Sequence, residues 1–178
     1  MTGRNHLIFG VTSGFLLDAA LLAKTGNTYG IDVATGIITL SALGSLLPDI
    51  DSPKSKIGKI LFFLSYPINK MFGHRTFTHS LFFLLIGICS YAAYSGDFQF
   101  MRNFYPIAFC VGFLGHLIQD TFTKGGCPWL YPFKRTRYSL SKQKYGSKME
   151  LFFTILLLMI FVMVLTVHDY IFIDWLVS

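Results

Sequence analysis

The stretch LFFTILLLMIFVMVLTV, residues 151–167, contains no charged side chain and is long enough to cross a bilayer, which takes roughly 17–25 residues of helix. Four earlier segments have similar character, although the second is rich in Gly, Thr and Ser. Small residues of that kind suit close helix packing in lipid. The sequence therefore predicts one integral-membrane domain over 1–178, an all-α polytopic helix bundle with spans at about 7–23, 32–47, 80–95, 104–119 and 150–170.

The overall composition agrees with a membrane protein. The chain is 53% hydrophobic and 13% charged, whereas soluble globular domains carry about 25% charged residues. Its net charge is +6. In a membrane protein, Lys and Arg mark the cytoplasmic side and attract anionic lipid. We therefore expect the lipid bilayer as the partner of this chain, and not nucleic acid.

A sixth apolar run, residues 57–72, is interrupted by Lys59, Pro67 and Lys70. Its uninterrupted core is short for a span, so we place it as a short interfacial or re-entrant helix. If this run instead crossed the membrane, the basic residues would be divided much more evenly between the two sides.

The distribution of basic residues supports five spans with a cytoplasmic N-terminus. Of the 15 Lys and Arg residues, all except Lys24 and Arg102 then lie on the inner side. The polar stretch 121–149 becomes a basic cytoplasmic loop, whose most ordinary role would be to fix topology.

Side chains that can bind metals gather at the same inner face. Of the 5 histidines, only His168 falls at the opposite end, in the last span, and it serves as a control. Ionisable groups at membrane depth are costly and usually functional. Because the topology came from Lys and Arg alone, this grouping favours a site over separate interfacial residues or turns. The candidate metal ligands are His6, Asp49, Asp51, His74, His79, His116 and Asp120.

Two motifs have spacings that make chemical sense. In GHLIQD, residues 115–120, His116 and Asp120 are four residues apart, so both project from one helix face and can serve one metal or two adjacent metals. In LLPDIDSP, residues 46–53, the two prolines are expected to hold the backbone extended and non-helical. Alternate residues of extended chain point apart, so one aspartate would bind metal while the other orients a histidine.

At LLPDIDSP, GHRTFTHS and GHLIQD, and at His6 before the first span, the sequence resembles the YdjM family of predicted inner-membrane, metal-dependent hydrolases. The resemblance covers about residues 1–170. It implies a multi-pass protein of the bacterial cytoplasmic (inner) membrane with a bound metal and a hydrolytic reaction. It carries over to the same seven His and Asp positions and supplies no substrate.

We therefore expect a membrane-bound metal-dependent hydrolase that cleaves a phosphoester of an anionic lipid or membrane-associated substrate. The cofactor would be Zn²⁺ or Mn²⁺, one ion or two, because mixed imidazole and carboxylate ligands suit both. The expected catalytic residues are Asp49, Asp51, His116 and Asp120. The expected substrate-binding residues are Arg75, Lys134, Arg135 and Arg137.

Two other functions fit parts of the sequence. GHLIQD resembles the His-x-x-x-Asp end of the last motif of type-2 phosphatidic acid phosphatases, which need no metal, but the companion motifs of that family are missing. A metal-binding membrane protein without enzymatic activity, or a transporter, is the third possibility. Transport sites usually lie near the bilayer midplane, whereas these candidates lie near the surface.

Overall fold

The computed structural model describes residues 2–25, 30–95 and 104–141, together with six positions between 152 and 163. All regular structure in these ranges is helical, apart from one isolated bridge between Cys127 and Tyr138. The all-α prediction is confirmed at this level. The elements are α1 (Gly3–Thr25), α2 (Ile31–Leu46), η1 (Leu47–Asp51), α3 (Lys56–Ile60), α4 (Phe62–Phe72), η2 (Phe77–His79), α5 (Leu81–Ser95) and α6 (Phe104–Thr121).

Four of the five predicted spans coincide with α1, α2, α5 and α6. Among the residues that the structure describes, two segments are long and apolar enough to cross a membrane, Gly3–Lys24 and Ile31–Asp51, and Leu81–Tyr94 is a shorter apolar helix. The fifth predicted span, 150–170, lies outside the described residues except for six helical positions: Phe152, Ile155, Leu156, Met159, Ile160 and Met163.

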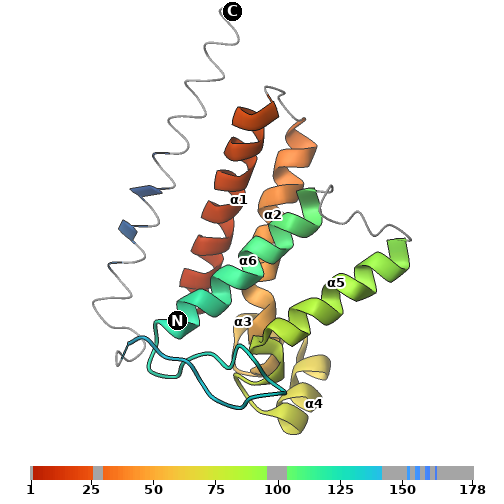
Figure 1. The fold of residues 1–178 in the computed structure, drawn as a ribbon, viewed down its shortest axis with the longest axis vertical. Helices are drawn as coiled ribbons and strands as arrows, with labels where there is room; N and C mark the ends of the chain where they lie inside the picture. Colours follow the sequence, from red (N-terminus) through yellow and green to blue (C-terminus); the bar gives the residue numbers. More distant parts are fainter. Residues whose placement is uncertain are drawn as a thin grey trace, which may run out of the picture.

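Helices α1, α2 and α6 pack against one another, and α5 contacts mainly η2 and α6 (Figure 1). Glycines permit the close approach of α2 and α6. A Cβ at Gly112 would collide with the carbonyl oxygen of Ser41, and one at Gly44 would collide with that of Phe109. The small residues of the second predicted span therefore do pack closely against a neighbouring helix.

The apolar run 57–72 forms two helices rather than one. Ser55 caps α3, because its Oγ accepts a hydrogen bond from the Gly58 N–H at 2.9 Å. The chain then breaks at Leu61 before α4 begins. Large apolar side chains on both helices are exposed, including Ile60, Phe63 and Met71 at 78%, 71% and 73%. Such a surface agrees with the interfacial placement, which stays a prediction.

The PDID stretch corrects one expectation. It lies in the 3₁₀ helix η1 and is not extended. Helix α2 runs directly into this turn, and Pro48 is the second residue of η1. The first N–H groups of a helix have no intrahelical acceptor, so the missing N–H of a proline costs nothing there. As Figure 1 shows, η1, η2, the start of α1 and the end of α6 all lie at one end of the bundle, beside α3 and α4.

Candidate metal centre

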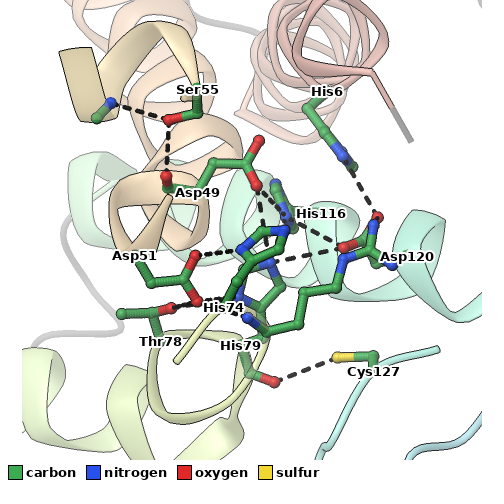
Figure 2. A network of polar contacts seen from close by, with 12 residues as sticks. His6, Asp49, Asp51, Ser55, His74, Thr78, His79, His116, Asp120 and Cys127 are labelled. Atoms are coloured by element: carbon green, nitrogen blue, oxygen red, sulfur yellow. Dashed lines mark hydrogen bonds and ion pairs between the residues drawn. The ribbon is translucent and has the colours of Figure 1, made fainter. Parts of the chain in front are cut away.

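The seven predicted ligands come from four parts of the chain and meet at that end of the bundle (Figure 2). α1 carries His6, and η1 carries both aspartates of the PDID stretch. The turn that ends in η2 carries His74 and His79, and α6 carries His116 and Asp120. The sequence prediction that these segments converge therefore holds in the structure.

His79 and His116 form the centre of the cluster. Both side chains are fully buried, and their Nε2 atoms lie 3.2 Å apart. The Asp120 Oδ2 atom lies 3.5 Å from the His79 Nε2 and 3.7 Å from the His116 Nε2. Two imidazole nitrogens this close repel each other unless a proton or a cation lies between them. The geometry thus provides a buried position for positive charge.

The other ring nitrogen of each histidine is engaged by an oxygen. The Nδ1 of His116 lies 2.6 Å from the carbonyl oxygen of Ser45. A carbonyl can only accept, so this Nδ1 carries the hydrogen and a neutral ring leaves Nε2 bare. The Nδ1 of His79 lies 3.2 Å from the Asp51 Oδ2. A carboxylate also accepts, so the hydrogen of a neutral His79 ring again lies on Nδ1 and its Nε2 is bare. Metal-binding histidines characteristically direct one nitrogen to the ion and the other to a carbonyl or carboxylate.

Asp51 accepts hydrogen bonds from several groups at once. Its Oδ2 accepts from the Arg75 backbone N–H at 2.8 Å and from the Thr78 hydroxyl at 2.7 Å. Its Oδ1 lies 2.7 Å from the His74 Nδ1. Because Asp51 is 1% exposed and both its oxygens are occupied in this way, it is placed to orient histidines.

Asp49 faces the cluster from the same 3₁₀ helix. Its Oδ1 lies 3.8 Å from the His79 Nε2 and 3.9 Å from the His116 Nε2, and its side chain is 16% exposed. The tight turn therefore gives the two aspartates different surroundings, as the sequence analysis expected, although through a 3₁₀ helix and not an extended chain.

His6 closes the centre from the α1 side. Its ring stacks on His116 with centroids 3.7 Å apart and an interplanar angle of 16°. Its Nε2 lies 3.5 Å from the Asp120 Oδ1, and the side chain is 1% exposed. Its Nδ1 has no hydrogen-bond partner among the described residues. A buried imidazole in this condition is unusual without a further ligand.

Within the part of the chain that the structure describes, two groups of donor atoms are compact enough to hold a metal ion, and they share His116. One consists of His79, His116 and Asp120, and the other of His6, Asp49 and His116. His74 and Asp51 belong to neither group within the described residues, and the His74 side chain is 43% exposed.

Arg75 lies inside the cluster and not at an open surface. It is 4% exposed, and its guanidinium donates to the Asp120 Oδ1 at 2.7 Å and to the Thr123 Oγ1 at 3.1 Å. Its backbone has a φ of 57°, in the left-handed region. This conformation lets one residue reach Asp51 through its N–H and Asp120 through its side chain.

The remaining predicted substrate-binding residues, Lys134, Arg135 and Arg137, are exposed. The Arg137 Nη2 donates to the carbonyl oxygen of His74 at 3.4 Å, so this basic segment borders the cluster at its most exposed histidine.

Several supporting residues could not be found from the sequence. The Ser45 carbonyl and the Thr78 hydroxyl belong to ordinary helical or turn residues, and nothing in their neighbourhood marks them. Cys127 is buried and donates its S–H to the His79 carbonyl oxygen at 3.2 Å. Burial, reinforced by the nearby Asp120 carboxylate, raises the pKa of Cys127 to about 12. The thiol therefore stays protonated and supports His79 as a donor.

Comparisons with known proteins agree with the resemblance. Residues 1–176 match the family described as YdjM inner membrane protein. The chain is 32% identical over 157 residues to the inner membrane protein YdjM of Escherichia coli (strain K12), covering 85% of this chain and 76% of that protein. It is 35% identical over 132 residues to the uncharacterized protein YvsG of Bacillus subtilis (strain 168), covering 74% of each. No solved structure matches the chain.

Proposed function

This chain belongs to the YdjM family and has an inner membrane location; on that premise we propose that it is a metal-dependent hydrolase with its centre at the cytoplasmic face. The proposal includes five spans, a cytoplasmic N-terminus and α3–α4 lying at the membrane interface. This placement puts the His/Asp cluster at the level of the lipid headgroups.

The observation that carries the proposal is the arrangement around His79 and His116. Both rings direct bare Nε2 atoms to one buried point, at 3.2 Å from each other, and the Asp120 Oδ2 faces that point. Two imidazoles and a carboxylate are the donor set of many catalytic zinc sites, which keep one further position open. The donors suit Zn²⁺ or Mn²⁺.

The geometry favours one ion over two. Both donor groups depend on His116, and its Nδ1 is already directed at the Ser45 carbonyl. A neutral imidazole then has a single lone pair to offer, so the two groups compete for it. The Asp120 Oδ1 is likewise paired with Arg75, and its Oδ2 faces the Nε2 atoms of His79 and His116.

The residues around the ion have separate tasks. Asp51 orients His79 and the exposed His74, and Arg75 directs Asp120 by holding one of its oxygens. Asp49 is the more exposed of the two aspartates and lies beside both Nε2 atoms, so it is placed to accept a proton from an attacking water. A bound divalent ion would supply the positive charge that lowers the pKa of water to roughly 7 and polarises a phosphoryl oxygen.

The substrate we propose is an anionic phosphoester lipid of the inner leaflet. The basic residues Lys134, Arg135 and Arg137 are exposed, and the Arg137 guanidinium contacts the carbonyl oxygen of His74. This segment would attract a negative headgroup. Arg75 is too enclosed in this structure to reach a phosphate without leaving Asp120, so its substrate-binding role stays a sequence prediction.

Activity assays with and without chelator test the proposal. The protein purified in detergent should hydrolyse phosphatidic acid, lose activity in EDTA and regain it with Zn²⁺ or Mn²⁺. His116→Ala should be inactive with or without added metal. Activity that survives EDTA in the wild type would instead indicate the metal-free phosphatase chemistry, with His116 as nucleophile.

A further inference from the structure

A second feature of the bundle lies away from the His/Asp cluster. A cavity of about 290 Å³ is bounded by α2, α5 and α6. Its walls are apolar or aromatic, and they include Leu40, Gly87, Tyr91, Tyr105, Phe109 and Cys110. None of the described residues that line it is charged, so this wall does not suit a polar solute.

The cavity is open on the α5 side. Gly87 is exposed and also lines the cavity, and a Cβ built on it would meet nothing within 4 Å. With the five proposed spans, this opening would face lipid. A buried layer of Leu84, Phe113 and Leu117 packs between α5 and α6, so a ligand would enter sideways past α5 and not through the centre.

The distance between the cavity and the metal donors matches the length of a lipid tail. The same three helices that line it lead to the metal donors at their inner ends, α2 to Asp49, α5 to His79 and α6 to His116. Along α6, Cys110 is six residues from His116, or about 9 Å at helical rise. Along α5, Tyr91 is ten residues from Leu81, the first residue of the helix and the second after His79, or about 15 Å. One leaflet is about 15 Å of hydrocarbon.

We propose that this cavity is an acyl-chain site that holds one tail of the lipid whose phosphoester headgroup lies at the His/Asp cluster. The inference rests on the proposed function and narrows its substrate to a long-chain lipid, as opposed to a water-soluble phosphoester. The exposed residues Lys134, Arg135 and Arg137 bind the headgroup. The apolar cavity wall favours substrates that have a long acyl chain.

Photo-labelling tests the site directly. The full chain, in phosphatidylcholine nanodiscs, is irradiated with phosphatidic acid that carries a diazirine midway along one acyl chain. Adducts should map to residues 87–91 and 105–110 and saturate with probe. Excess unlabelled long-chain phosphatidic acid should compete with the probe, and dihexanoyl phosphatidic acid should not.

Gly87 offers a matched pair of variants, because a side chain there extends into the open space. Gly87→Leu places an isobutyl side chain at the cavity wall and should lower labelling about tenfold, as the loss of a couple of buried methylene contacts implies. Gly87→Ala should stay within about twofold, since one methyl group removes little of that space. Labelling that does not saturate, that is unchanged in Gly87→Leu, or that falls on other residues would overturn the acyl-chain site.

The metal content of the same wild-type preparation separates this inference from the proposed function. A preparation that binds no metal but shows saturable labelling lost in Gly87→Leu contradicts the hydrolase and supports the acyl-chain site. A metal-loaded preparation without such labelling contradicts the acyl-chain site alone.

Discussion

Arg75 and Asp120 form a buried ion pair across 45 positions of sequence, with the Arg75 Nη2 2.7 Å from the Asp120 Oδ1. The pair joins the turn before α5 to the end of α6. The backbone N–H of the same arginine also binds Asp51. Arg75 therefore holds two carboxylates that differ in role, one directed at the proposed ion and one at the histidines.

Removing the arginine side chain should destabilise the protein, because Asp120 would be left buried without its cation. Arg75→Met should lose about 3–5 kcal/mol of stability. The apparent melting temperature in detergent should fall by roughly 10 °C. Arg135→Met removes an exposed cation and should change little. An unchanged melting temperature in Arg75→Met would show that the pair does not hold the fold together.

Asp51 should affect the metal only through the histidines that it orients. Asp51→Asn keeps the shape of the side chain but weakens the carboxylate–histidine contacts, so metal affinity should fall by about 10–100-fold without being abolished. Competition with a chromophoric chelator measures this affinity. Asp32→Asn, an exposed aspartate near the start of α2, is the control. Complete loss of metal in Asp51→Asn would make Asp51 a direct ligand, as the sequence analysis allowed.

The convergence of the site could be predicted from the sequence because it depends on topology. Counting Lys and Arg placed the segments that carry the seven candidate ligands at one face, and α2, α5 and α6 begin and end within two residues of the predicted spans. Hydrophobic pattern and charge can be read from the local sequence, so predictions based on them do not require knowledge of the packing.

The roles within the site could not be predicted, because they depend on contacts between distant segments. Arg75 was expected to bind substrate, yet its guanidinium is enclosed by Asp120 and Thr123. The division between Asp49 and Asp51 follows from a 3₁₀ turn that the flanking prolines did not reveal. No feature of the local sequence indicates that the Ser45 carbonyl faces His116.

Close packing of α2 and α6 should make Gly112 intolerant of any side chain. Gly112→Ala places a methyl group against the Ser41 carbonyl and should destabilise the bundle by about 1–3 kcal/mol. Gly87→Ala is the matched control, since it adds the same methyl group to a helix where nothing lies within 4 Å. Thermal unfolding of both variants in one detergent compares them. Equal melting temperatures would contradict the close helix contact.

Metal analysis of the purified protein tests the central claim most directly. Wild type and His168→Ala, whose histidine the sequence places at the far end of the last span, should each contain about one equivalent of Zn²⁺ or Mn²⁺ per chain, as a mononuclear site requires. His79→Ala should contain almost none, because it removes one of the two facing imidazoles. Wild-type protein without metal after growth in Zn²⁺ and Mn²⁺, or equal metal in His79→Ala and wild type, would contradict the account.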